Sequence, residues 1–464
     1  MSVKKLWEKI LPDKNPYKPV ESVYESEQER CVEEAKNVEQ KKITSFNAFW
    51  NVSNSIQGVA ILAMPYVIKG GGWWSVVAII LVAILSNYTG QILIKCHYDD
   101  VIDEATGETV SVRTRSSYAE VGDAMWPVYG KNIVLFIQVL ELLFMATLYP
   151  IVFVSVTHTL FPHFGLSSGV WVLIFGVLML PNIFLRRLYH ISIMSSLTVA
   201  SATSVFFAVC VYCFTEIDAW DVHNLEKFSI KEFVASTGVV VASYSSQMYL
   251  SVIESDMRNP SSIGSVMNAG YFAMTILKVG IGVIAYMTFG DATSQVVTLN
   301  LPAGILLTAI NSIVLLLAMS SYTLPMFTVF EILEKDSKWL IIGNSSELGD
   351  DKESRNYEER LINVRRTAIR LALMFITLTM AISVPHFCMV LSFIGSFTGA
   401  FLEMVFPCWF YLALKHKTLS KSTTIVNVLI ITFSLLFMGV GMYSSAFDMI
   451  KAFKLHTKEV WTID

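Results

Sequence analysis

The feature that most constrains this chain is a stretch apolar enough to enter a membrane but interrupted by polar residues. Residues 47–72 read NAFWNVSNSIQGVAILAMPYVIKGGG. A helix of about 20 residues crosses a bilayer, yet this one carries Asn54 and Gln57 and then Gly58 and Pro65. Polar side chains and broken backbone are tolerated at membrane depth where they are buried in protein or line a watery cavity. The stretch therefore predicts a binding site, and a Pro-kinked structural helix is the alternative.

A second interrupted segment favours the binding site. Residues 233–253 are apolar at both ends, and their centre holds five consecutive polar or amphipathic residues, Ser243, Tyr244, Ser245, Ser246 and Gln247. One or two such side chains can bond back to their own helix or to a neighbour, but five in a row are harder to accommodate. Two broken spans in corresponding positions of two halves are typical of inverted-repeat transporters. Ser320 and Ser321, shortly before Pro325, predict a third break that faces the first.

The composition is that of an all-α polytopic membrane protein. Hydrophobic residues make up 54% of the chain and charged residues 16%, and the mean hydropathy is +0.54; soluble domains carry about 25% charged residues. The net charge of -4 is small, and no nucleic-acid-binding module is visible, so we expect no nucleic-acid partner. We predict eleven spans, at residues 47–69, 73–96, 133–156, 170–185, 190–215, 231–253, 264–289, 301–330, 366–384, 386–411 and 425–447.

Charge in the connecting loops predicts the orientation of these spans. Most of the 34 lysines and arginines fall in the N-terminal tail and in every second loop after it. Cytoplasmic loops carry such an excess, so the N-terminus is predicted in the cytoplasm and the C-terminus outside or in a lumen. The expected organisation is a cytoplasmic tail (1–45), a transmembrane domain (46–447) with a cytoplasmic loop inside it (335–365), and a lumenal or extracellular tail (448–464).

The sequence gives no indication of enzymatic chemistry. No nucleophile–base set, zinc motif or phosphate-binding loop appears, so neither a metal nor a cofactor is expected. None of the six cysteines lies clearly in an outer loop, and Cys210 and Cys213 lie in an apolar helix where packing is the expected role. A channel or receptor would need a pore or a ligand-binding ectodomain, and the short outer loops provide no ectodomain. These observations favour a transporter over an intramembrane enzyme, a channel or a receptor.

Four ionisable residues are candidates for ion coupling. Glu141 lies about 12 Å into its span at 1.5 Å per residue, where a carboxyl group must be paired or protonated; a structural carboxyl is the alternative. Lys278 lies in the middle of a span. Its ammonium either replaces a structural cation, which argues against sodium dependence, or forms a salt bridge with Glu141 or Glu403. Glu254 ends its span near the cytoplasmic boundary, where a gate or cap role competes with an ion role.

Several motifs together resemble the amino acid/auxin permease family. They are WNVSNSIQG followed by PYVIKGGGWW, YTGQILIKCHY, GETVSVRTRSSY, QVLELL, SYSSQMYLSVIE, LKVGIGVIAYMTFGD, SYTLPMF and GSFTGAF. The resemblance covers about residues 45–445. It implies a LeuT-like fold with ten of eleven spans in a five-plus-five inverted repeat, in which helices 1 and 6 are broken. It also implies proton-coupled exchange of an amino acid into an acidic vesicle.

The resemblance implies a substrate site around the two breaks. Asn54, Gln57, Gly58 and residues 243–247 would form it, while Glu141, Glu254 and Lys278 occupy matching positions. Departures from the family pattern, such as Ala63 where vesicular members carry Gly and the unexpected Glu403, suggest a divergent paralog. The predicted substrate-binding residues are Asn54, Gln57, Gly58, Ala60, Ala63, Ser243, Tyr244, Ser245, Ser246, Ser320 and Ser321.

The predicted function is secondary active transport of a small neutral amino acid, as proton-coupled uptake of a GABA- or glycine-like substrate into synaptic or other cytoplasmic vesicles. The partners are then the amino acid, the proton gradient and the lipid bilayer. The carboxylate would meet backbone N–H groups at Ala60 to Ala63, and the ammonium would meet carbonyls and hydroxyls at Ser243 to Ser246. A plasma-membrane or lysosomal permease with another substrate is the alternative.

Overall fold

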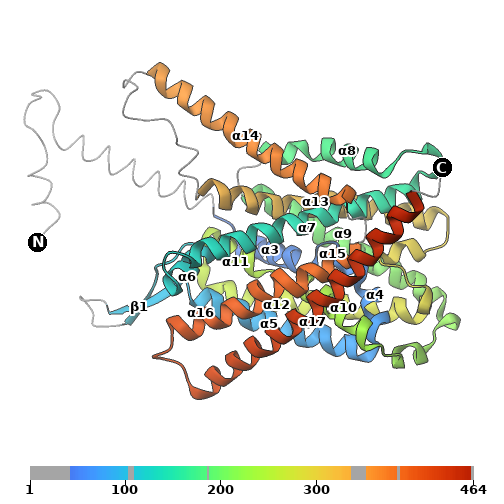
Figure 1. The fold of residues 1–464 in the computed structure, drawn as a ribbon, viewed down its shortest axis with the longest axis horizontal. Coiled ribbons are helices and arrows are strands. Elements are labelled where there is room, and N and C mark those ends of the chain that lie inside the picture. Colours follow the sequence, from blue (N-terminus) through green and yellow to red (C-terminus); the bar gives the residue numbers. More distant parts are fainter. Residues whose placement is uncertain (1–41, 103–108, 185–187, 336–351, 384–386, 461–464) are drawn as a thin grey trace, which may run out of the picture.

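The computed structural model describes residues 42–102, 109–184, 188–335, 352–383 and 387–460. Its long helices lie side by side and run in roughly the same direction (Figure 1). Eight of the described helical segments are long and apolar enough to cross a membrane, among them α5 (Trp73–Lys95), α7 (Gly130–Leu160), α12 (Ile263–Phe289) and α13 (Ile305–Lys335). A shorter apolar segment comprises α8 (Ser168–Met179) and η3 (Leu180–Phe184). The chain is therefore a mostly helical membrane protein, as predicted.

The first interrupted segment folds as three pieces. α3 (Ser45–Gln57) begins at Thr44, whose hydroxyl accepts the N–H of Asn47 at 3.2 Å, and it ends where Gly58 takes a φ of +40°. The 3-10 turn η1 (Gly58–Ala63) follows. Regular helix resumes as α4 (Met64–Gly71) with Pro65 in its first turn, a position where proline costs no hydrogen bond. The sequence-predicted interruption is therefore present.

The second interrupted segment is a helix pair with an irregular centre. α10 (Ile230–Ala242) and α11 (Gln247–Asp256) are joined by residues 243–246. α3 lies against α9 (Leu188–Thr215) and α12, and α10 packs on α4 and on α15 (Phe387–Ile394). A Cβ on Gly395 would lie only 1.9 Å from the carbonyl oxygen of Gly238. The absence of a side chain on Gly395 therefore lets the segment after α15 approach the backbone of α10 closely. Both interruptions are thus buried in the bundle.

The predicted third break is wrong. α13 is one continuous helix through Ser320, Ser321 and Pro325. Proline removes the hydrogen bond to the carbonyl four residues earlier, but such losses are tolerated where neighbouring helices enclose the segment. α13 packs on both α7 and α9, and the Ser320 hydroxyl donates to the carbonyl of Leu316 within its own helix at 2.9 Å. Packing therefore keeps this helix intact despite its sequence.

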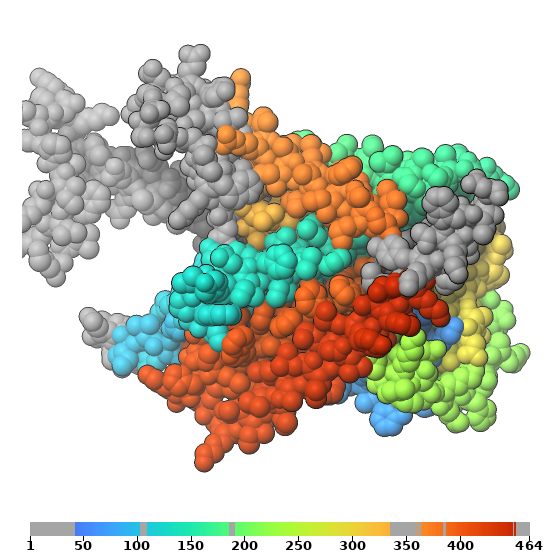
Figure 2. Space-filling model, viewed as in Figure 1, coloured from blue at the N-terminus to red at the C-terminus, as the bar shows by residue number. Residues whose placement is uncertain are grey.

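Other boundaries differ from the sequence predictions. α14 (Lys352–Ser383) begins inside the predicted 335–365 loop, and α17 (Lys421–Val460) continues beyond residue 447 into the predicted C-terminal tail. Residues 387–414 form α15, π-helical turns at Gly395–Val405, and α16 (Phe406–Leu414). Nearly all of the predicted N-terminal tail lies outside the described residues. Many exposed side chains of α17 (red in Figure 2) are apolar, among them Leu429, Phe433 and Leu436, as expected for a lipid-facing surface.

Residues 97–118 alternate Thr and Val around Ala105-Thr106-Gly107-Glu108, a pattern that predicts a small hairpin, and the structure confirms it. β1 (Tyr98–Ile102) pairs antiparallel with β2 (Thr109–Arg113), and Tyr98 lies opposite Arg113. The hairpin shares one end of the bundle with the start of α3, which joins the end of α11 through a backbone bridge between Ile43 and Met257. At the opposite end, Lys227 pairs with Asp291 and Lys231 with Asp448. These contacts place the hairpin and the start of α3 at one end of the bundle and two ion pairs at the other.

Candidate substrate and ion-coupling site

A small cavity lies where the two interrupted segments meet. Its volume is about 30 Å³, enough for one or two water molecules and too small for an amino acid. Among the predicted substrate residues, those that line it are Asn54, Gln57, Gly58, Ala60, Ser243 and Ser321. The structure thus brings the first break, the second break and α13 together, even though α13 itself is unbroken.

The polar groups in this cavity include one that lacks a partner. Both the amide oxygen and the amide nitrogen of Gln57 are buried without a hydrogen-bond partner among the described residues. Asn54, in contrast, donates to the hydroxyl of Ser195 at 3.1 Å. Buried polar groups are normally paired, and each exception needs an explanation. A bound polar ligand, or water in its absence, would satisfy Gln57.

Five predicted residues do not line the cavity. The hydroxyls of Tyr244 and Ser246 point to α12 instead, where they meet Thr275 at 2.8 Å and Tyr271 at 2.7 Å. Ser320 meets Thr198 at 2.8 Å. The other two residues outside the lining set are Ala63 and Ser245.

Residues that the sequence analysis missed complete the cavity wall. Tyr149 and Met145 come from α7, and Tyr249 comes from α11. A Cβ on Gly58 would lie 3.5 Å from the Tyr149 hydroxyl, so this ring reaches the first break directly. The sequence carried a partial signal, because Met145 falls on the face of α7 that also holds Gln138 and Glu141. Tyr149 follows one turn later on that helix.

Lys278 connects the two breaks. Its side chain is fully buried, and its ammonium donates to the carbonyl oxygen of Ile56 at 2.8 Å, to that of Ser243 at 2.5 Å and to the Ser243 hydroxyl at 3.0 Å. The ammonium also lies 3.6 Å from the ring centre of Tyr244, within cation–π range. These carbonyls end α3 and α10, where the helix dipoles are negative. An ammonium among carbonyl oxygens has the surroundings of a bound cation, and no ion pair to Glu141 or Glu403 is present among the described residues.

Two buried carboxyl groups lie near the same junction. Glu141 on α7 has no hydrogen bond to either oxygen among the described residues. Glu403, in the π-helical turns, accepts one hydrogen bond from Ser86 at 3.1 Å. The two carboxyl groups lie near each other, and Ser245 lies beside both. Glu141, Glu403 and Ser245 are named the carboxyl cluster below. It lies next to the second break, and neither carboxyl group forms an ion pair with Lys278 among the described residues.

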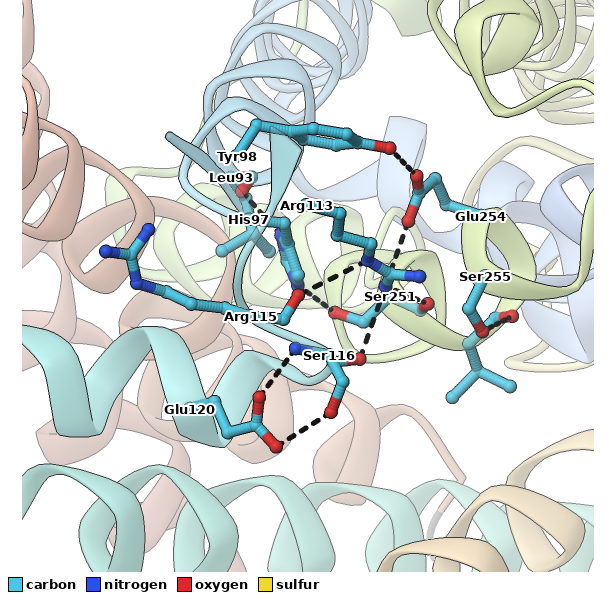
Figure 3. Close-up of polar contacts among 11 residues, drawn as sticks. Leu93, His97, Tyr98, Arg113, Arg115, Ser116, Glu120, Ser251, Glu254 and Ser255 are labelled. Atoms are coloured by element: carbon cyan, nitrogen blue, oxygen red, sulfur yellow. Dashed lines mark hydrogen bonds and ion pairs between the residues drawn. The ribbon is translucent and has the colours of Figure 1, made fainter. Parts of the chain in front are cut away.

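Glu254 belongs to a different site, at the hairpin end of the bundle (Figure 3). Its side chain is buried and forms an ion pair with Arg113 at 2.9 Å, and the Tyr98 hydroxyl donates to its other oxygen. Arg113 also reaches the carbonyl of Ser251 at 3.2 Å, and the His97 ring contacts the Ser251 hydroxyl at 2.8 Å. These five residues are named the hairpin cluster, and they fasten the hairpin to α11.

Burial governs the protonation of the hairpin cluster. It lowers the pKa of His97 from 6.5 to about 4, and the nearby Arg113 acts in the same direction. Burial, together with the hydrogen bond to Glu254, raises the pKa of Tyr98 to about 12. At neutral pH the cluster therefore holds a neutral imidazole and a neutral phenol beside the Arg113–Glu254 contact. The choice between the gate role and the ion role of Glu254 stays a prediction.

The bundle of helices long enough to span a membrane has the fold of LeuT-like membrane transporters. The structure is similar to that of a Na+-coupled sialic acid symporter in a substrate-bound outward-open state, with a TM-score of 0.52 over 88% of this chain and 89% of the other. The sequence identity is 11%, so this similarity concerns the fold alone.

Sequence comparison gives the family. The model of the transmembrane amino acid transporter protein family matches residues 41–447, and the chain belongs to that family. It is 32% identical to the vesicular inhibitory amino acid transporter of Xenopus tropicalis over 94% of this chain and 82% of that protein. It is 27% identical to the vesicular GABA transporter of Caenorhabditis elegans over 92% of this chain and 84% of that protein.

Proposed function

We propose that this protein is a proton-coupled secondary transporter that takes a small neutral amino acid, of the GABA or glycine type, into an intracellular vesicle. The observation that carries the proposal is the unpartnered amide of Gln57 in a cavity between two interrupted helices, in a chain whose relatives include a vesicular GABA transporter. A buried amide accepts and donates hydrogen bonds, as recognition of a carboxylate and an ammonium requires.

In this proposal the substrate lies between the two breaks. The buried amide of Gln57 at the first break supplies a donor for its carboxylate and an acceptor for its ammonium, and both amide atoms lack a partner among the described residues. The Ser243 oxygens at the end of α10 accept the Lys278 ammonium in this structure, so they are not assigned to the substrate. The cavity of about 30 Å³ must widen before an amino acid enters. The structure therefore corresponds to a closed arrangement, and rocking of one helix bundle about the breaks would open each side in turn.

The proposed architecture has eleven spans. The eight long helical segments are joined by three more, α3–η1–α4, α8–η3 and α10–α11, and the first ten form a five-plus-five inverted repeat with broken helices 1 and 6. The hairpin end faces the cytoplasm in this proposal, because most lysines and arginines of the loops fall on that side. The C-terminus then lies in the vesicle lumen.

Coupling to protons is assigned to the carboxyl cluster. Glu141 and Glu403 are fully buried and share no ion pair with a described cation, and a carboxyl group in such surroundings is stable when protonated. Lys278 in turn occupies the place of a structural cation, so the proposal excludes sodium as the driving ion. Proton release from the cluster on one side of the membrane would accompany the conformational change.

Uptake into proteoliposomes tests this proposal. Radiolabelled GABA, glycine and a panel of other amino acids are offered under an imposed pH gradient, with sodium present or replaced. We expect accumulation of GABA or glycine that collapses with the gradient and is independent of sodium. The variant Gln57→Met, which keeps the side-chain length and removes the amide, should raise KM. Accumulation of a different amino acid alone would favour a plasma-membrane or lysosomal permease, and flux without accumulation would favour a channel.

A further inference from the structure

A larger pocket lies at the end of the bundle opposite the hairpin. Its volume is about 320 Å³, which falls in the range of about 300–1,000 Å³ found for small-molecule sites. Residues of α4, α10, α15 and α17 line it, and they include Tyr66, Lys69, Glu232, Cys388 and Asp448. This charged pocket has ten times the volume of the central cavity, and the transport site described above does not include it.

The charged pocket and the central cavity follow each other along the same helices. On α10, Val239 lines the charged pocket and Ser243 lines the central cavity. On α15, Cys388 lines the charged pocket and Leu391 lines the central cavity. Residues three or four apart share one face of a helix, and one turn advances about 5.4 Å. The charged pocket is therefore about one turn farther along the bundle axis.

The charges around this pocket are of both signs, and two of them form no ion pair among the described residues. Lys231 and Asp448 form an ion pair with each other at 3.1 Å. Among the described residues, the ammonium of Lys69 donates a hydrogen bond to the backbone carbonyl of Asp291, at 2.7 Å, and lies 5.8 Å from the ring centre of Tyr66. Glu232 has neither an ion pair nor a hydrogen bond to its side chain among the described residues. One cation and one carboxylate thus face the same pocket without neutralising each other.

We propose that the charged pocket is a second binding site for a small zwitterionic amino acid. Lys69 binds the carboxylate of the ligand, and Glu232 binds its ammonium. Both contacts are charge-assisted hydrogen bonds, which are stronger than neutral ones. A molecule with only one of the two charges leaves one pocket residue unsatisfied. The inference rests on the proposed function for the identity of the ligand, and it adds a docking site one turn away from the transport site.

Equilibrium dialysis of the full-length protein in lipid nanodiscs tests the second site. With radiolabelled glycine or GABA, the wild type should bind two molecules per chain, one of them more weakly. Glu232→Gln and Lys69→Gln should each weaken the second site by at least ~10-fold, the loss expected for one charge-assisted hydrogen bond, and leave the first site unchanged. Unlabelled acetate and methylamine should compete for the second site far less than glycine does.

The matched control is Glu226→Gln, which removes an exposed carboxylate at the same end of the bundle and should retain both molecules. A stoichiometry of one in the wild type, together with normal gradient-driven uptake, would overturn the second site and leave the proposed function intact. Retention of two sites of unchanged affinity in Glu232→Gln and Lys69→Gln would also overturn it. Absence of both amino acid binding and uptake would refute the proposed function and the second site together.

Discussion

Replacing Lys278 with Met is the most direct test of how the two interrupted helices are held together. The change keeps an unbranched side chain of similar length and removes the ammonium. The carbonyl oxygens of Ile56 and Ser243 then lose the donor that they share. A buried polar group left without a partner costs about 1–3 kcal/mol, so the two carbonyls together cost roughly 2–6 kcal/mol. The cation–π contact with Tyr244 is lost as well.

A loss of this size is expected to separate the ends of α3 and α10. Among the described residues, Lys278 is the side chain that donates to Ser243, and the Ser243 hydroxyl itself donates only within α10. We therefore expect Lys278→Met to reach the membrane but to show no gradient-driven uptake and a lower unfolding temperature. Lys278→Arg keeps the positive charge but carries a larger planar group, and it should retain partial activity. Addition of sodium is expected to restore some thermal stability to Lys278→Met, because the vacated carbonyl site suits a cation.

The assay measures uptake in proteoliposomes and thermal unfolding of the same purified variants, with sodium or with choline as the main cation. Lys278→Met with normal uptake and an unchanged unfolding temperature would refute the assignment of Lys278 as the connection between the breaks. Wild-type uptake that requires sodium would refute its role as a substitute for a structural cation.

Three further predictions concern the ionisable residues. Glu141→Gln should lose uptake driven by a pH gradient but retain amino acid exchange, and Glu403→Gln is the matched variant. Loss of gradient-driven uptake in Glu403→Gln alone would place the proton on Glu403. Normal uptake in both variants would exclude the carboxyl cluster as the proton site. Glu254→Gln removes the buried ion pair with Arg113, which costs about 3–5 kcal/mol. It should increase solvent access at the hairpin end, as measured by hydrogen exchange, and unchanged exchange would contradict the gate role. The pKa of His97 falls from 6.5 to about 4 in the folded protein, so the unfolded state binds more protons between these pH values. The free energy of unfolding should therefore fall by roughly 3 kcal/mol as the pH drops from 6.5 to 4. His97→Gln should remove this part of the pH dependence of the unfolding temperature.

Several features of the site could be predicted before any fold was known. The polar residues at 54–58 and 243–247 are anomalous in apolar segments, because lipid cannot satisfy them, and both segments are interrupted in the structure. Lys278 is anomalous for the same reason. Its carbonyl partners are those expected if its ammonium replaces a structural cation, one of its two predicted roles. The hairpin at residues 98–113 follows from alternation and turn composition within a short stretch. For the polar groups at membrane depth the local sequence suffices, because the cost of exposing them to lipid does not depend on which partner satisfies them.

The direction of each side chain, however, is decided by the tertiary structure. Tyr244 and Ser246 have the same local signal as Ser243, yet their hydroxyls bond to α12 and only Ser243 faces the cavity. Tyr149 gives no signal of its own and reaches the first break because α7 packs beside it. Pro325 predicts a break that enclosure between α7 and α9 prevents. The sequence by itself determined which segments carry polar groups at membrane depth; the packing of distant helices decided which of those groups meet, since a polar side chain in an irregular segment turns to whichever partner its neighbours supply.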